Sequence, residues 1–220
     1  MITNIVGNKI LNYLRTRGEN IVAIYPAEEG KSITKEMIEE DNPDVIIICY
    51  WPYLLPKEII DIPKYGCINF HPSLLPKNRG WYPAVWEVME GDDAAGVTLH
   101  LIDEGTDTGP ILAQATFPIK EEDTGGSVYE KSQKAMILLF KNIWEQLHER
   151  GVALKEQDHS TATYHSKSAT NVSDKIDLNK EYKAGDLFRL IKAKTFKDKS
   201  YAYYKKDGDL YRVKIEVTKE

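Results

Sequence analysis

The stretch Cys67–Ile111, CINFHPSLLPKNRGWYPAVWEVMEGDDAAGVTLHLIDEGTDTGPI, decides how the rest of the chain is interpreted. Its opening apolar run is typical of a buried strand. If that strand continues through His71, then Asn69 and His71 point to the same face, because strand side chains alternate. A second strand-like run, Gly96–Asp103, leads into a turn-rich segment that contains Asp107. Chemistry in open α/β sheets collects at the carboxyl ends of strands, so we expect these polar side chains at one site.

Further apolar runs flank this stretch at Ile21–Tyr25, Asp44–Tyr50 and Ile111–Ile119. The continuous run Asp44–Tyr50, DVIIICY, is typical of a parallel strand that is covered on both faces. Helical spacing of apolar residues predicts the remaining elements, which are Lys9–Arg17, a helix near Thr34–Ile38, Pro83–Glu90, Ser127–Arg150 and Ala184–Lys194. The fold class is therefore α/β, with an open, mostly parallel twisted sheet and flanking helices.

The C-terminal third has a different composition. Residues 151–182 are polar and rich in Ser, Thr, Asp and Lys, and we interpret them as a linker that wraps the domain. After the helix at 184–194, two β-rich runs flank Asp207-Gly208, a strong hairpin signal. The predicted division is a core at 1–150, the linker at 151–182, and a C-terminal helix and β-hairpin at 183–220. A lone hairpin is marginal in water, so this one is expected to build a homodimer or to close over a substrate.

Composition excludes several classes of protein. The 220 residues carry a net charge of -5, and 42% of them are hydrophobic, which fits a soluble globular protein. Residues 1–150 carry 14 basic and 23 acidic side chains, whereas residues 151–220 carry 15 and 11. A nucleic-acid binder is normally basic, so no nucleic-acid partner is expected. We also expect no membrane segment, a cytoplasmic location and reduced cysteines, because both cysteines lie in apolar runs.

The central stretch resembles the folate-dependent formyltransferase family. The family motif is Asn-x-His-(Pro/Asn)-Ser-x-Leu-Pro, followed downstream by Asp-Glu-Gly-x-Asp-x-Gly. The matching residues here are Asn69, His71, Pro72, Ser73, Leu75, Pro76, Asp103, Glu104, Gly105, Asp107 and Gly109. The resemblance covers roughly residues 20–150 and implies a Rossmann-like core, 10-formyltetrahydrofolate as cosubstrate and a catalytic set of Asn69, His71 and Asp107. It also implies a first strand, for which only a stub precedes Asn4.

Formyl transfer requires an oxyanion to be stabilised and a proton to be moved. Asn69 can donate to the oxyanion, and His71 can donate to it or shuttle the proton. Asp107 can orient His71 and, when ionised, raise the pKa of His71. Taken singly, Asn69 could instead be a strand-end polar group and Asp107 a turn former. His100 is expected to be a core histidine, and His148, His159 and His165 show no ligand spacing, so no metal site is predicted.

The resemblance also implies where the pterin of the folate binds. By matching positions the slot is formed by Tyr53, Leu54 and Leu55 after the DVIIICY run, together with Asp103, Glu104 and Thr106. Recognition by backbone groups is physically sensible, because the pterin edge offers paired donors and acceptors. The alternative for Tyr53–Leu55 is a loop that covers the core.

The segment Pro76–Pro83, PKNRGWYP, resembles the sugar N-formyltransferases within the family. Lys77 or Arg79 could pair with a pyrophosphate, or be solvated loop charges. Trp81 could pack on a sugar or plug the core, and Tyr82 stands where histidine is commoner. In the tail, Phe196 and Tyr201 could stack on a nucleotide base or pack within the hairpin.

The residues and the resemblance together predict an enzyme that formylates the amine of a nucleotide-linked amino-dideoxy hexose. The best guess for this substrate is dTDP-4-amino-4,6-dideoxyglucose. Such a product would serve the synthesis of O-antigen or another surface polysaccharide. Three alternatives stay open. The chain could be a methionyl-tRNA formyltransferase-like enzyme, although its 70-residue tail is small for one; a formyltetrahydrofolate hydrolase without the usual N-terminal regulatory domain; or a non-catalytic scaffold.

Overall fold

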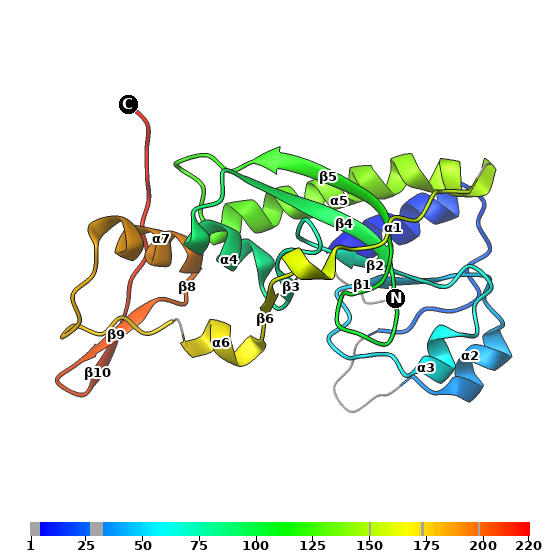
Figure 1. The fold of residues 1–220 in the computed structure, drawn as a ribbon, viewed down its shortest axis with the longest axis horizontal. Coiled ribbons are helices and arrows are strands. Elements are labelled where there is room, and N and C mark those ends of the chain that lie inside the picture. Colours follow the sequence, from blue (N-terminus) through cyan, green and yellow to red (C-terminus); the bar gives the residue numbers. More distant parts are fainter. Residues whose placement is uncertain (1–4, 27–32, 150, 173, 198) are drawn as a thin grey trace.

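The computed structural model describes residues 5–26, 33–149, 151–172, 174–197 and 199–220. Its centre is a four-stranded sheet in the order β1-β2-β4-β5 (Figure 1). The strands are β1 (Ile46–Cys49), β2 (Cys67–His71), β4 (Ala94–Leu101) and β5 (Ile111–Pro118). Each strand overlaps a run that the sequence predicted to be a strand, and β2 does continue through His71.

The directions of the strands correct one part of the predicted fold. Strands β1 and β2 are parallel, whereas β2 and β4, and β4 and β5, are antiparallel. The α/β class with flanking helices is confirmed, but the described sheet is mixed rather than mostly parallel. The turn-rich residues 102–110 join β4 to β5 directly, and a parallel pair would need a longer crossover connection.

The predicted strand at Ile21–Tyr25 is not a strand in the structure. Residues 20–26 pair with no strand in the described part of the chain. A strand exists through its hydrogen-bond ladder, and in this segment Ile21 packs against the main core whereas Val22 is exposed. The N-terminal stub at residues 1–4 lies outside the described residues, and α1 (Ile5–Thr16) already begins at Ile5.

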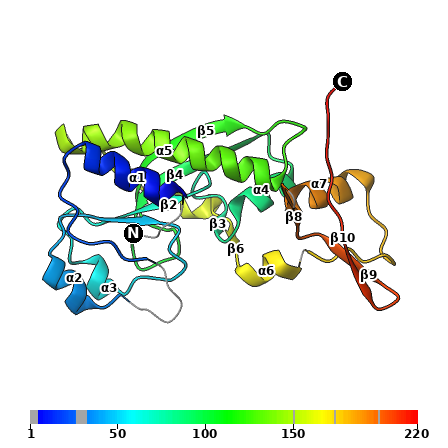
Figure 2. The same cartoon turned by 180° about the vertical axis from the view of Figure 1, so that it is seen from behind.

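Helices α1 and α5 (Gly125–Glu149) lie side by side along one side of the sheet (Figures 1 and 2). The buried side chains Met136, Phe140 and Trp144 of α5 follow one another at a spacing of four, so they form one apolar stripe. This stripe packs on the sheet, where the rings of Phe140 and Phe70 are 5.2 Å apart. The long predicted helix is therefore the main cover of the core.

Three shorter helices surround the ends of the strands. Helices α2 (Lys35–Asp41) and α3 (Lys57–Ile60) lie near β1, and the Thr34 hydroxyl caps α2 by accepting from the Met37 N–H. Helix α4 (Pro83–Glu90) has the bounds that the sequence predicted. Proline suits the first position of a helix because its missing N–H would have no partner there.

Residues 151–172, which we call the strap, are built against the core. The strap contains a 3-10 turn, η1 (His159–Thr161), a short strand β6 (Tyr164–His165) and α6 (Lys167–Val172). Strand β6 pairs in parallel with β3 (Arg79–Gly80). Gly80 has φ 88°, and a Cβ there would lie 2.5 Å from the His165 carbonyl oxygen, so this pairing requires glycine. The segment predicted as a linker thus contacts the central stretch directly.

The predicted C-terminal helix and hairpin are present. Helix α7 (Ala184–Lys194) packs on α4 and α5, and is followed by the short strands β7 (Thr195–Phe196) and β8 (Lys199–Ser200). Strands β9 (Tyr203–Lys206) and β10 (Asp209–Arg212) form the antiparallel hairpin. Its turn residues Asp207 and Gly208 have φ values of 52° and 91°, the positive angles that an Asp-Gly hairpin turn requires.

Candidate active site

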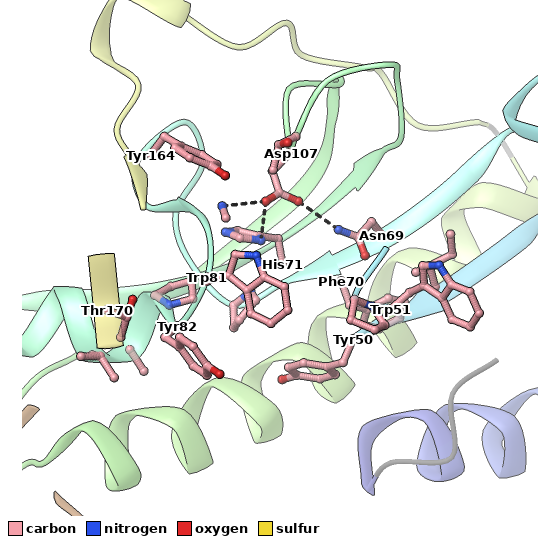
Figure 3. Close-up of a pocket in the computed structure, with 18 of the residues that line it drawn as sticks. Tyr50, Trp51, Asn69, Phe70, His71, Trp81, Tyr82, Asp107, Tyr164 and Thr170 are labelled. Atoms are coloured by element: carbon pink, nitrogen blue, oxygen red, sulfur yellow. Dashed lines mark hydrogen bonds and ion pairs between the residues drawn. The ribbon is translucent and has the colours of Figure 1, made fainter. Parts of the chain in front are cut away.

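A cavity of about 700 Å³ opens at the carboxyl ends of β1 and β2 (Figure 3). It extends from these strands past the start of α4 to the C-terminal region, where Thr170, Asn171, Phe196 and Tyr201 line it. The cavity therefore lies where an α/β sheet is expected to place its chemistry. Most of its lining is aromatic or aliphatic, and polar side chains lie both at the strand ends and in the C-terminal region, where Asp174 and Lys194 also line it.

The end of the cavity beside the strands contains the predicted catalytic set. Asn69 and His71 alternate along β2 and both line the cavity, with Asp107 facing them from the loop after β4 (Figure 3). The Asn69 Nδ2 donates to Asp107 Oδ1 over 3.3 Å, and Asp107 Oδ2 lies 3.4 Å from His71 Nδ1. The structure thus brings together all three residues that the sequence singled out.

Asp107 is held by its backbone as well as by its neighbours. Its φ of 53° places it in the left-handed region, which aspartate tolerates better than most residues. Its Oδ2 accepts the backbone N–H of Gly80 at 2.9 Å. Burial by itself would raise the pKa of Asp107, but the nearby His71, the hydrogen bond with His100 and the Gly80 N–H outweigh it and hold that pKa below its usual range. Asp107 is therefore an anion at neutral pH.

His71 has the opposite balance of effects. Burial lowers the pKa of His71, and the charge of Asp107 opposes this shift without cancelling it. Asp107 thus raises the pKa of His71 as expected, but desolvation of the buried ring is the larger effect and leaves that pKa below its usual value. His71 Nε2 lies 2.8 Å from the Asn78 carbonyl oxygen, which can only accept, so Nε2 carries the proton. Neutral His71 then presents Nδ1 to Asp107.

His100 belongs to the same cluster, although the sequence indicated a core histidine. It is buried and lines the cavity, and the β2–β4 register places it directly opposite Asn69. Its Nδ1 lies 2.8 Å from the Leu101 carbonyl oxygen, and its Nε2 lies 3.1 Å from Asn69 Nδ2 and 3.5 Å from Asp107 Oδ1. We call Asn69, His71, His100 and Asp107 the catalytic floor.

The residues predicted to hold the folate divide into two groups. Tyr53, Leu54, Leu55, Asp103 and Thr106 line the cavity, and Leu54 is 69% exposed. Glu104 is not among the lining residues, and its carboxylate pairs with Lys57 at 2.8 Å. The Asp103 carboxylate accepts from the Gly105 N–H and the Thr108 hydroxyl, so it shapes the loop that leads to Asp107.

The residues predicted to bind the second substrate divide in the same way. Trp81, Tyr82, Phe196 and Tyr201 line the cavity, as do Thr170 and Asn171, which the sequence did not indicate. We call Thr170, Asn171, Phe196 and Tyr201 the C-terminal wall. Thr170 and Asn171 come from α6 in the strap, and Phe196 and Tyr201 from the region that follows α7.

Lys77 and Arg79 lie outside the cavity. Lys77 pairs with Asp92 at 3.4 Å. The Arg79 side chain is buried, and its Nη2 donates to Gln157 Oε1 at 2.6 Å and lies 3.0 Å from His159 Nδ1. The sequence suggested that either cation could pair with a pyrophosphate, but neither is among the lining residues. A charged side chain in a loop gives no sign of which way it turns, and Arg79 turns towards the strap.

The described residues contain neither a metal-binding cluster nor a membrane-spanning helix. Within them, no group of three or more His, Cys, Asp and Glu side chains is placed to hold a metal ion. Helices long and apolar enough to cross a membrane are likewise not found in these parts of the chain.

Residues 11–141 match the family model described as formyl transferase, and residues 170–219 match the one described as N-formyltransferase dimerization C-terminal domain. A methionyl-tRNA formyltransferase from Lachnospira eligens is 34% identical over 193 residues, which is 88% of this chain and 60% of that protein. The chain spans about half the length of the curated relatives it matches.

Solved structures with the same fold include enzymes that act on sugars. A sugar N-formyltransferase from a Shewanella species has a TM-score of 0.83 at 24% identity, covering 99% of this chain and 96% of its own. A 4-N formyltransferase from Francisella tularensis has a TM-score of 0.76 at 26% identity, covering 86% and 78%. An N-formyltransferase from Helicobacter canadensis, in complex with folinic acid and dTDP-3-aminofucose, has a TM-score of 0.63 at 24% identity, covering 86% and 65%.

Proposed function

The chain belongs to the formyl transferase family, and we propose that it moves a formyl group from 10-formyltetrahydrofolate to the amine of a nucleotide-linked amino-dideoxy hexose. The observation that carries the proposal is the joining of two features in one cavity. The catalytic floor and the C-terminal wall both line it. Such an arrangement suits two substrates that meet over the floor, because holding them together supplies much of the rate.

The reaction forms a bond between the amine nitrogen and the formyl carbon, and breaks the bond from that carbon to N10 of the folate. The tetrahedral intermediate carries an oxyanion, and one proton leaves the amine while one reaches N10. Asn69 has two amide protons, which point to His100 and Asp107. The contact with Asp107 is the longer one, and we expect the oxyanion to take it over. Removing such a donor costs ~3 kcal/mol of barrier.

The proton of the amine has an acceptor beside the floor. Neutral His71 holds its own proton on Nε2 against the Asn78 carbonyl, which leaves Nδ1 free to accept. Ionised Asp107 lies beside that nitrogen and stabilises the imidazolium that forms. In this scheme the pair takes the proton from the amine and returns it towards N10, which is general base followed by general acid catalysis.

The residues present fit the pterin of a reduced folate. Tyr53, Leu54 and Leu55 line the cavity together with Asp103 and Thr106, and Tyr53 and Leu54 are exposed at its rim. Trp51 also lines the cavity, and its buried indole N–H has no hydrogen-bond partner among the described residues. A buried donor without a partner is costly, and a pterin acceptor would satisfy it. The folate supplies the activated formyl group.

The choice of acceptor is the finer part of the proposal. The acidic balance of residues 1–150 disfavours tRNA. The sugar N-formyltransferase from Shewanella shares this fold at a TM-score of 0.83, which supports a sugar acceptor. The nucleotide is best taken as dTDP and the sugar as 4-amino-4,6-dideoxyglucose, for O-antigen or other surface-polysaccharide synthesis in the cytoplasm. The second candidate, a methionyl-tRNA formyltransferase, rests on the 34% identity to the relative from Lachnospira eligens.

The test is a panel of dTDP-, UDP- and GDP-linked 3-amino and 4-amino sugars incubated with 10-formyltetrahydrofolate and followed by product mass. A gain of one formyl group on a nucleotide sugar supports the proposal. Formylation of methionyl-tRNA alone would replace it with the second candidate. Release of formate without an acceptor would indicate a hydrolase, and no turnover of the folate at all would indicate a scaffold.

We also propose a homodimer through the C-terminal region. The matched dimerization domain supports it, as do the exposed side chains of Leu210 and Tyr211 on β10, because a lone hairpin gains stability from a partner surface. Replacing both with aspartate should halve the mass measured by light scattering. A wild-type chain that is monomeric at working concentration would exclude this assembly.

A further inference from the structure

We infer that Gln157 is a positioning residue for Asp107, a role that rests on the proposed formyl transfer. Gln157 lies in the strap and is 5% exposed. Its amide Nε2 donates to the carbonyl oxygens of Asp107 and Gly109, at 2.9 and 2.7 Å. Its Oε1 accepts from Arg79 Nε and Nη2, at 3.3 and 2.6 Å. Both amide protons and both lone pairs are therefore used, which is the full capacity of the group.

These four contacts close a ring around the catalytic aspartate. Gln157 holds the Asp107 backbone from one side, and its other end binds the side chain of Arg79. The residue after Arg79 is Gly80, whose backbone N–H binds the Asp107 carboxylate. The backbone and the carboxylate of Asp107 are thus fixed by the same small network. Since Asp107 has a positive φ that the loop must maintain, the clamp on its carbonyl restricts the loop where it turns.

The chemistry of the ring requires an amide at position 157. Two carbonyl oxygens face the Nε2 end and one guanidinium faces the Oε1 end, so the side chain must donate and accept at once. Glutamate would satisfy Arg79 but would turn an acceptor towards two acceptors. Methionine has a similar shape and would make none of the four hydrogen bonds. The two substitutions therefore separate loss of the clamp on Asp107 from loss of the contact with Arg79.

The expected effects of substituting Gln157 on kcat and on the pKa of His71 depend on how closely Asp107 is held to His71. The titratable and charged groups that surround Asp107 are His71, His100 and, through Gln157, Arg79. A loosened Asp107 would stabilise the imidazolium of His71 less, so kcat should fall by about 10- to 100-fold, as is usual for a displaced catalytic group. The KM for the sugar nucleotide should change by less than about 3-fold, because Gln157 does not line the cavity. The pKa of His71 should also move further down, since Asp107 is the group that opposes its lowering.

The experiment compares Gln157→Met and Gln157→Glu with Glu156→Gln, an exposed neighbour in the strap, in the full-length chain. Turnover, KM, thermal unfolding and the NMR titration of His71 without substrates are measured for each. A lower kcat in both Gln157 variants and a lower His71 pKa in Gln157→Met, with the control unchanged, are the expected results. Wild-type kcat in Gln157→Glu would overturn the inference, and so would an unchanged His71 pKa in Gln157→Met or a loss of thermal stability alone. Because the titration needs no substrate, failure of the proposed reaction leaves this readout intact.

Discussion

The two ends of the cavity are built in different ways. In the catalytic floor, the side chains are buried or half-buried, and hydrogen bonds and close ion-pair contacts join them from two strands and one loop. In the C-terminal wall, Phe196 and Tyr201 meet edge to face at 5.6 Å, and Tyr201 is 49% exposed. The side chains of the floor are therefore held in place without substrate, whereas the wall has an aromatic side chain that is still exposed to solvent. This difference fits the proposal that the floor carries the chemistry and the wall the recognition of substrate.

The largest effect should come from the floor. His71→Ala or Asn69→Ala should lower kcat by about 100-fold or more, because each change removes a group that acts on the oxyanion or the proton. Asn142→Ala, on an exposed position of α5, is a matched control for Asn69→Ala and should have wild-type activity. Single-turnover rates with saturating substrates give the comparison. A variant that keeps half of the wild-type rate would remove that residue from the mechanism.

Asp107→Asn should have a slightly smaller effect, also in kcat. It keeps the size of the side chain and removes the charge, so we expect kcat to fall by about 100-fold with little change in the KM for the sugar nucleotide. Asp107 opposes the lowering of the pKa of His71, so without it that pKa falls further. The acidic limb of the pH–rate profile should then move to lower pH. A raised KM with intact kcat would instead assign Asp107 to the binding of substrate.

A substitution in the C-terminal wall should change KM rather than kcat. Tyr201→Ala should raise the KM for the sugar nucleotide by about 10-fold with kcat nearly unchanged, since stacking on a base contributes ~1–3 kcal/mol. Tyr65→Ala is a suitable control, because Tyr65 is exposed but does not line this cavity. Initial rates over a range of sugar nucleotide concentrations decide the matter. Equal KM values for the two variants would assign Tyr201 to packing of the C-terminal region.

The smallest effect concerns a second buried carboxyl group, Glu87 on α4. Burial raises the pKa of Glu87 to about 8, and one of its oxygens has no hydrogen-bond partner in the described part of the chain. Asp107 is also buried, but its partners keep its pKa low. The contrast shows that burial alone raises the pKa of a carboxyl group, whereas burial among donors and cations does not.

A folded-state pKa raised in this way makes stability depend on pH. The contribution of protonated Glu87 is complete below pH 4.5 and is lost as the pH rises towards about 8. Stability should fall across this window by at most about 1.4 kcal/mol per pH unit. Glu87→Gln should flatten that part of the profile in denaturant unfolding, while the equivalent change at the exposed Glu156 should not. The same slope in wild type and Glu87→Gln would show that Glu87 does not titrate in this range.

The sequence predicted the floor better than the wall, for a physical reason. Asn69 and His71 share one strand, where alternation alone places them on the same face, and Asp107 follows a strand that ends beside them. His100 is buried, as the sequence indicated, but its place opposite Asn69 depends on the register between β2 and β4. Register is set by pairing partners and turn geometry across the sheet, and no local pattern shows it.

The same limit explains what was missed in the strap and the loop before it. The polar composition of residues 151–182 predicted a linker, and composition does not show which carbonyl oxygens a buried glutamine will meet. Gln157 and Thr170 are therefore visible only in three dimensions, where the strap crosses the loop that contains Arg79 and Gly80. The predicted strand at Ile21–Tyr25 is absent for a similar reason, because an apolar run in the sequence does not show whether a neighbouring strand is present to pair with it.

The strap has a consequence for the order in which the working protein comes into being. The Asn78 N–H donates to the hydroxyl of Thr163, which lies 85 positions later in the chain, and Gly80 pairs with His165. A ribosome that has finished α5 has already made Asn69, His71 and Asp107, yet the segment that fixes their loop does not exist. A nascent chain stalled at that point, or a protein clipped between α5 and the strap, would hold every catalytic candidate without an assembled site. Synthesis of the strap is thus what first allows the loop at Asn78 and Gly80 to form these contacts.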